Sequence, residues 1–300
     1  MSEPSAVTRC GLVALVGRPN VGKSTLLNHL IGQKVSITSR KPQTTRQRLL
    51  GIKTVGRDQI VYVDTPGYHQ GQRKAINQYM VRTISNVLND VDVVLFVIDR
   101  LRLLEEDLTL LSDVRQGRAP VLLVINKIDE LPDRTALLPF IAGLQAEVGE
   151  FADIVPVSAL KEQFTDELEA CIVRHLPENP WFFPEDQLTD KSARYLAAEY
   201  VREKITRQMG DELPYEVAVE IEEYKVVDAV HRIGAVIYVE KESQKRMLIG
   251  ENGSRLKRIG TQARQDLERL LESRVMLSLW VKVKRGWSDD ERALKSLGYD

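Results

Sequence analysis

A glycine-rich segment near the start of the chain has the spacing of a phosphate-binding loop. Residues 17–24 read G-R-P-N-V-G-K-S and fit the pattern G-x-x-x-x-G-K-[ST] between an apolar run and a helix-like run. The glycines let backbone N–H groups point at phosphate oxygens, and the start of a helix adds a favourable dipole. We expect Lys23 to reach the β- and γ-phosphates and Ser24 to bind Mg²⁺. The expected nucleotide contacts are Gly17, Arg18, Pro19, Asn20, Val21, Gly22, Lys23, Ser24 and Thr25.

Two further segments predict the remaining ligands of the metal and of the γ-phosphate. Residues 64–67 read D-T-P-G after an apolar run, so we expect Asp64 to hold Mg²⁺ through water and the Gly67 N–H to meet the γ-phosphate, with Thr65 and Pro66 beside them. Residues 36–48 are polar, as expected of a segment that the γ-phosphate orders and hydrolysis releases. Thr44 and Thr45 are the candidate metal ligands in that segment, and we prefer Thr45.

A fourth segment predicts which base is bound. Residues 126–129 read N-K-I-D after an apolar run. Guanine presents two adjacent donors that one carboxylate accepts together, whereas adenine has no such pair, so Asp129 is the expected specificity residue. Asn126 and Lys127 would frame the base, and a backbone N–H at Ser158 or Ala159 would meet the guanine 6-oxygen. Together with the phosphate loop, this ordered set marks the GTPase superfamily.

The elements that position these motifs alternate between strands and helices. Short apolar runs at 12–16, 60–63, 91–98, 121–125 and 154–157 read as strands buried on both faces. Helix-like stretches follow at 23–31, 75–88, 105–115, 135–148 and 164–175. This alternation predicts a doubly wound, mostly parallel α/β domain that binds its ligand at the carboxyl ends of the strands.

The second part of the chain has a different pattern. Three prolines between 176 and 190 indicate a stiff linker, and a helix is expected at 192–209. The next strands alternate apolar and polar residues, which is typical of a sheet covered on one face. A helical stretch at 245–271 is broken at 250–253. We therefore expect an α+β domain in the order α-β-β-α-α-β.

The break at 250–253 reads G-E-N-G, and this spacing in that element order is typical of the type II K-homology (KH) domain, whose G-x-x-G loop clamps single-stranded nucleic acid. Cations surround the loop, and the tail interleaves cations with tryptophans, a pattern suited to stacking on bases. Glu251 departs from the commoner basic residue in this loop. The expected RNA contacts are Gly250, Glu251, Asn252, Gly253, Arg255, Lys257, Arg258, Lys282, Lys284, Arg285 and Trp287.

Composition limits the remaining possibilities. The chain has 300 residues, 43% hydrophobic and 28% charged, with a formal net charge of -1, which argues against nonspecific binding of nucleic acid over the whole surface. No apolar run approaches the roughly 18 residues of a membrane-spanning helix, and no signal peptide is expected. Two distant cysteines, Cys10 and Cys171, suggest a reducing cytoplasm. From the change of sequence pattern along the chain, we place an α/β nucleotide domain at 1–178, a linker at 179–191, a KH domain at 192–284 and a tail at 285–300.

The motifs together resemble the Era family of bacterial GTPases. The phosphate loop, Q-T-T-R, D-T-P-G and N-K-I-D are followed by I-G-E-N-G and by V-K-V-K-R-G-W-S-D-D-E-R near the end. The resemblance implies hydrolysis of GTP to GDP, binding near the 3′ end of small-subunit ribosomal RNA, a role in small-subunit maturation, no DNA partner and peripheral contact with the inner membrane. It also implies a subgroup without the catalytic Gln, here replaced by Tyr68, in which Asn20 supports a potassium ion. The catalytic residues would then be Lys23, Thr45, Asn20 and Gly67.

Two other functions remain open on the sequence alone. A GTPase coupled to tRNA modification would need a modifying domain or partner, and we see no such domain. A non-enzymatic RNA chaperone with a relic GTP site is disfavoured by the intact Lys23, Ser24, Asp64 and Asp129. His69 is a weak candidate to replace the missing Gln.

Overall fold

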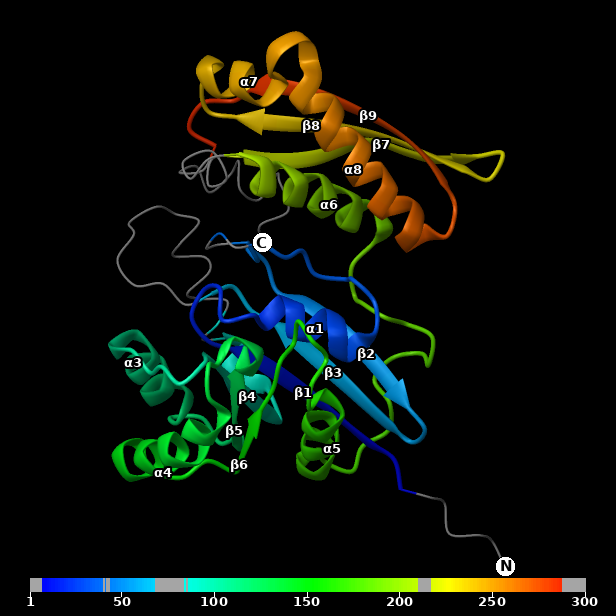
Figure 1. Cartoon of the computed structure of the whole chain (residues 1–300). Helices are drawn as coiled ribbons and strands as arrows, with labels where there is room; N and C mark the ends of the chain where they lie inside the picture. Colours follow the sequence, from blue (N-terminus) through cyan, green and yellow to red (C-terminus); the bar gives the residue numbers. More distant parts are fainter. Residues whose placement is uncertain are drawn as a thin grey trace, which may run out of the picture. The chain divides into compact units, whose positions relative to one another are not determined.

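A computed structural model of the chain describes residues 7–39, 41, 44–67, 84, 86–209 and 217–287 (Figure 1). Its contacts divide the polypeptide into two compact units, which meet along the chain between Asp190 and Lys191, and the second unit also includes the segment Ile37–Thr44. Three sequence expectations lie outside the described residues: the positions of Tyr68 and His69, most of the helix expected at 75–88, and the tail after Trp287.

The first unit is built on a six-stranded sheet with the order β2-β3-β1-β4-β5-β6. All neighbouring strands run parallel except β2 and β3, which are antiparallel. The expected mostly parallel sheet is therefore confirmed, with the antiparallel edge strand β2 as an addition that we did not anticipate. The strands are β1 (Arg9–Val16), β2 (Leu49–Val55), β3 (Asp58–Asp64), β4 (Val93–Asp99), β5 (Val121–Asn126) and β6 (Asp153–Pro156).

Helices cover both faces of this sheet (Figure 1). Apolar side chains of α3 (Glu105–Val114) and α4 (Leu137–Val148) pack in one core cluster with alternate residues of β1, β4 and β5. On the other face, α1 (Lys23–Ile31) contacts α5 (Thr165–His175), where His29 Nε2 lies 2.9 Å from the Thr165 hydroxyl. This doubly wound arrangement brings the carboxyl ends of β1, β3, β4 and β5 to one edge of the sheet.

The proline-rich linker lies along the free edge of β2 within the first unit. The Ile52 N–H donates to the Leu188 carbonyl oxygen at 2.9 Å, and the Leu50 N–H donates to Asp190 Oδ1 at 2.9 Å. Buried Gln59 accepts from the backbone N–H groups of Phe182 and Phe183 at 2.9 and 3.0 Å. The two bonds from β2 satisfy part of a sheet edge that would otherwise be open to pairing with another chain.

The second unit is a three-stranded sheet with helices on one face. Its elements are α6 (Ala193–Gln208), β7 (Val217–Val227), β8 (Val230–Val239), α7 (Glu242–Ile249), the short 3-10 turn η4 (Glu251–Gly253), α8 (Ser254–Leu271) and β9 (Arg274–Val283). The sheet order is β7-β8-β9, with β8 and β9 parallel. Side chains of α6 and α8 pack with alternate residues of all three strands in the core. The expected order α-β-β-α-α-β is confirmed.

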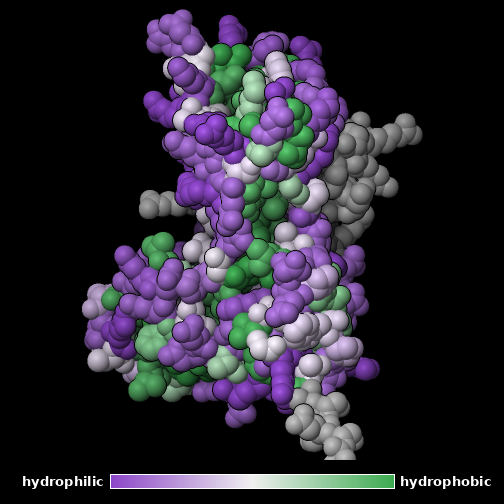
Figure 2. All heavy atoms as spheres, turned by 90° about the vertical axis from the view of Figure 1, so that its right-hand side faces the viewer, coloured by the Kyte–Doolittle hydropathy of each residue, from purple (hydrophilic) through white to green (hydrophobic). Residues whose placement is uncertain are grey.

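Hydrophilic residues make up much of the surface visible in Figure 2. Among the described residues, no helix is both long enough and apolar enough to cross a lipid bilayer.

Candidate functional site: a phosphate loop, a base-reading edge and a nucleic-acid loop

The phosphate loop joins β1 to α1 and closes around the Lys23 ammonium. Lys23 Nζ donates to the carbonyl oxygens of Gly17 and Arg18 at 2.8 and 2.9 Å. Burial lowers the pKa of Lys23 to about 8. A β-carbon on Gly22 would lie 2.2 Å from the side-chain nitrogen of Asn126, so the second glycine of the motif is required for packing as well as for its φ of 103°.

The Arg18 side chain is directed toward α3. Arg18 Nε donates to Asp107 Oδ1 at 2.7 Å, and the other oxygen of this fully buried carboxylate accepts from the Leu104 N–H at 2.9 Å. One acidic side chain therefore both caps α3 and fixes the loop. The ion pair engages Arg18 Nε and holds the side chain toward α3. Asp107 was missed from sequence because no motif includes it.

The D-T-P-G segment packs directly against the phosphate loop. A β-carbon on Gly67 would lie 2.9 Å from Pro19 Cα, and the Thr65 hydroxyl donates to the Leu15 carbonyl oxygen at 2.7 Å. The close approach explains why glycine occupies position 67. The segments that we expected to bind the γ-phosphate therefore lie together.

Hydroxyl groups converge on the buried carboxylate of Asp64 at the end of β3. Asp64 Oδ2 accepts from Ser24 Oγ at 2.8 Å, from Ser36 Oγ at 2.8 Å and from Thr45 Oγ1 at 3.4 Å, and the Ser24 and Thr45 hydroxyls are 2.9 Å apart. Burial raises the pKa of Asp64, and the hydroxyl hydrogen bonds oppose that rise. Asp64 Oδ1 is also buried and has no hydrogen-bond partner among the described residues. An all-oxygen set with an unsatisfied carboxylate oxygen has the chemistry that Mg²⁺ prefers.

Of the two candidate threonines, only Thr45 reaches this oxygen cluster. The Thr44 hydroxyl instead bonds to the Lys41 carbonyl oxygen at 2.7 Å and to Ser39 Oγ at 2.6 Å. Thr25 lies in the first turn of α1 next to Ser24. Ser36 was missed from sequence, although it begins the polar segment that we identified.

The base-reading segment at the end of β5 is held by Asn126. Its side-chain nitrogen donates to the Val21 carbonyl oxygen at 2.8 Å, while Oδ1 accepts from the N–H groups of Lys127 and Ala159 at 2.8 and 3.0 Å. Lys127 has a left-handed φ of 62°, and its Nζ donates to the Asn20 carbonyl oxygen at 2.7 Å. Asn126 thus ties the base-reading segment to the phosphate loop.

Asp129 lies in the short 3-10 turn η1 (Ile128–Glu130) that follows this segment. One of its oxygens accepts a hydrogen bond from the Ser158 hydroxyl, which fixes the carboxylate. The Ser158 N–H donates to the Gln163 carbonyl oxygen at 3.1 Å, and the Ala159 N–H is engaged by Asn126. A backbone contact with the guanine 6-oxygen therefore stays a prediction and requires one of these N–H groups to share its hydrogen.

In the second unit, the G-x-x-G loop forms a tight turn between α7 and α8. Gly250, Asn252 and Gly253 have φ values of 72°, 49° and 74°, all in the left-handed region. The side chains of Glu251 and Asn252 are exposed, as are Lys257 and Arg258 on the first turns of α8. The loop therefore presents backbone groups and a helix start to solvent, with two cations beside them.

The other expected RNA contacts differ from this pattern. Arg255 is partly buried and donates to the Met247 carbonyl oxygen at 2.6 Å, so it closes the loop. Lys282 Nζ is 2.8 Å from Glu222 Oε1, and Lys284 Nζ lies 5.3 Å from the centre of the Tyr238 ring.

Strand alternation explains the position of these two lysines. Val281 and Val283 pack in the core beneath the helices, so Lys282 and Lys284 project from the opposite face of the sheet. The exposed Arg285 follows them. Trp287 is fully buried, which corrects our expectation that its ring is on the surface and able to stack on a base.

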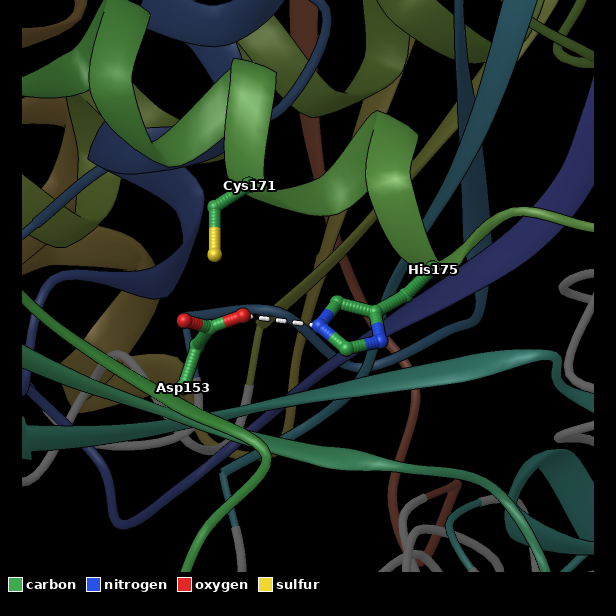
Figure 3. A group of neighbouring side chains, drawn as sticks. All are labelled: Asp153, Cys171 and His175. Atoms are coloured by element: carbon green, nitrogen blue, oxygen red, sulfur yellow. Dashed lines mark hydrogen bonds and ion pairs between the residues drawn. The ribbon is translucent and has the colours of Figure 1, made fainter.

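A second polar cluster lies away from these motifs, between β6 and α5 (Figure 3). His175 Nε2 is 2.7 Å from Asp153 Oδ2, and Cys171 lies one helical turn before His175. These are metal-ligand types, but an Arg174 nitrogen lies 3.3 Å from Cys171 Sγ and 3.6 Å from Asp153 Oδ2. Burial raises the pKa of Cys171 to about 12. The guanidinium already supplies the positive charge, so this cluster ties the end of α5 to the sheet.

Comparison with known proteins decides between the interpretations of these sites. Residues 12–127 match the model of the family described as 50S ribosome-binding GTPase, and residues 212–288 match the KH domain. The chain is 58% identical over 295 residues to the GTPase Era of Pseudomonas fluorescens, covering 98% of each chain. The chain belongs to the GTPase Era family. It is also 58% identical to the GTPase Era of Pseudomonas syringae pv. tomato, covering 100% of this chain and 99% of the relative.

Two solved Era structures extend the similarity to three dimensions. Each is 42% identical to this chain, covers 97% of it and 99% of its own chain, and superposes with a TM-score of 0.93. One is Era in complex with MgGDPNP and nucleotides 1506–1542 of 16S ribosomal RNA. The other is an Aquifex aeolicus Era variant bound to GDP·AlF4⁻. As an Era family member, this chain is a GTPase with a KH domain.

Proposed function

We propose that this chain is a GTP-driven switch that binds small-subunit ribosomal RNA near its 3′ end and assists small-subunit maturation. The observation that carries the proposal is the presence, in one chain, of a complete nucleotide site and an exposed G-x-x-G loop. A solved Era relative holds both MgGDPNP and nucleotides 1506–1542 of 16S ribosomal RNA, which supports the assignment of the two sites.

At the nucleotide site, Lys23 would turn from the loop carbonyls to the β- and γ-phosphates when GTP binds. Ser24 and Thr45 would coordinate Mg²⁺ directly, and Asp64 would hold it through water. When bound, the ion would neutralise the negative charge that develops on the phosphates during hydrolysis. The Gly67 N–H would contact the γ-phosphate, and Asp129 would select guanine.

Asn20 is the residue to which we assign a potassium ion. With Tyr68 at the position of the usual water-orienting Gln, another source of transition-state stabilisation is needed. The Asn20 side chain is exposed at the tip of the phosphate loop, and its φ is 65°. A cation at this position would act where other GTPases use an arginine finger. Peripheral contact with the inner membrane also stays a prediction of the family resemblance.

Replacing Asn20 should abolish the acceleration of GTP hydrolysis by potassium relative to sodium. Because alanine at a left-handed φ is itself strained, Asn20→Gly is the cleaner variant, with Asn20→Ala beside it. The measurement is the ratio of single-turnover hydrolysis rates in the two salts, with GDP affinity as the control for an intact loop. A ratio equal to that of the parent in both variants would show that the ion is held elsewhere.

A crosslinking map of the bound RNA tests the second half of the proposal. Ultraviolet crosslinking of the full chain to total bacterial RNA, read by sequencing, should give crosslinks in the 3′-end region of small-subunit RNA and peptide adducts in 250–258. Crosslinks confined to transfer RNA would favour instead a GTPase coupled to tRNA modification.

A further inference from the structure

The three hydroxyl groups on Asp64 Oδ2 do not have the same role. Ser24 and Thr45 are the proposed direct ligands of the metal, so their oxygens would turn to the ion when it binds. Ser36 is the third donor, at 2.8 Å, and its side chain is 3% exposed while Asp64 is fully buried. Its hydrogen bond is therefore the one that can hold the carboxylate both before and after metal binding.

Ser36 is itself held by a single side chain of α1. Asn28 Oδ1 accepts from the N–H groups of Val35 and Ser36 at 2.9 and 2.8 Å, and Asn28 Nδ2 donates to the Ser36 carbonyl oxygen at 2.7 Å. Helix α1 is followed by Gly32, whose φ of 79° turns the chain back toward Asn28. Three hydrogen bonds from one amide thus fix the backbone at the start of the polar segment.

This arrangement links a helix and a strand of the nucleotide site. Asn28 lies on the same helix as Lys23 and Ser24, so its three hydrogen bonds fix the position of Ser36 relative to the phosphate loop. Asp64 ends β3 and enters the D-T-P-G turn. The Ser36 hydroxyl therefore joins the helix that carries one metal ligand to the strand that carries another.

We propose that Ser36 is a positioning residue for the metal carboxylate, kept in place by Asn28, which orients Asp64 for Mg²⁺ bound with the nucleotide. The inference rests on the proposed magnesium site. Without the Ser36 hydroxyl, Asp64 loses a strong fixed donor, and metal binding must supply the ordering of the carboxylate. Guanine and phosphate contacts are untouched, so the loss should appear only in the magnesium-dependent part of nucleotide binding.

The test measures dissociation of fluorescent GDP from the full chain, in Mg²⁺ and in EDTA. In the parent, Mg²⁺ should slow dissociation. Ser36→Ala should reduce this magnesium effect by about tenfold, as expected for loss of a hydrogen bond to a charged group, and leave the EDTA rate unchanged. Asn28→Ala should act in the same direction. Ser273→Ala is the control, because its hydroxyl bonds a backbone carbonyl in the second unit.

Each outcome bears on the inference. A full magnesium effect in both Ser36→Ala and Asn28→Ala would overturn it. Faster dissociation by the same factor in Mg²⁺ and in EDTA would also overturn it, since that is the result of a general loosening of the fold. No magnesium effect in the parent would contradict the metal site itself, and the inference with it. Thermal unfolding in EDTA shows whether each variant is folded.

Discussion

Replacing Asp129 by Asn should weaken GTP binding by roughly ten- to a hundredfold and improve binding of xanthosine triphosphate. In the proposed site, the carboxylate would accept two hydrogen bonds from the guanine edge, and a hydrogen bond to a charged group contributes on the order of 1.5–3 kcal/mol. The asparagine amide would place its NH2 group opposite the 2-amino group of guanine, so that two donors would face each other. Xanthine has a carbonyl oxygen at that position and can accept the hydrogen bond. Titration of both fluorescent nucleotides against parent and variant measures the change.

The structure supplies a matched control for this variant. Glu130 is the next residue along the same turn and is exposed, with an Arg100 nitrogen 3.5 Å from its carboxylate. Glu130→Gln removes a charge from the same surface and should leave both affinities as in the parent. Asn126 is unsuitable, because its side chain also holds the phosphate loop. Unchanged GTP affinity in Asp129→Asn would show that another residue reads the base.

Adding negative charge to the G-x-x-G loop should reduce RNA affinity while nucleotide binding is preserved. In the double variant Glu251→Asp and Asn252→Asp, the net change is one negative charge and the glycines are kept. Asn252 has a φ of 49°, a conformation that Asp tolerates as well as Asn, and both side chains are exposed, so the turn should survive. For every phosphate that the protein no longer neutralises, the log–log salt dependence of RNA binding should also flatten by about 0.7 for single strands.

A charge added elsewhere in the same unit separates a local effect from a general one. Ala229 lies in the exposed turn between β7 and β8 and has a φ of 57°, so Ala229→Asp adds the same charge in a conformation that suits Asp. RNA affinity across a salt series should fall for the loop variant and hold for Ala229→Asp. Equal affinity of the loop variant and the parent at every salt concentration would place the RNA elsewhere, such as on the lysines at the end of β9.

The sequence predicts most of the fold because its signals are local. Runs such as 121–125 are buried on both faces of the sheet, and the strand–helix alternation then determines the parallel topology. Strand β2 was missed because Leu49–Val55 includes a glycine and a polar end, and β3 is the only strand of the sheet with which it pairs. In the second unit, period-two alternation in β9 correctly separated core from surface positions, with Leu277 and Leu279 packed under the helices.

The nucleotide motifs were predictable because each is a short fixed pattern, whereas their supports are long-range contacts. Asp107 is 89 positions from Arg18, and Ser36 is 28 positions from Asp64, so no local sequence pattern predicts either hydrogen bond. The burial of Trp287 was not predicted for a related reason. The local sequence around a tryptophan near the end of the chain does not show whether its ring packs inward or faces solvent. The contact of Lys282, Lys284 and Arg285 with RNA stays a prediction.

Phosphate release from GTP by the purified full chain tests the central claim most directly. In Mg²⁺ and potassium, the parent should convert GTP to GDP and phosphate, should leave ATP intact, and should lose this activity on Lys23→Ala, while a fragment of ribosomal RNA from the 3′ end should bind through the second unit. The absence of phosphate release from GTP, with or without that RNA, would contradict the account and leave an RNA-binding protein with a relic nucleotide site.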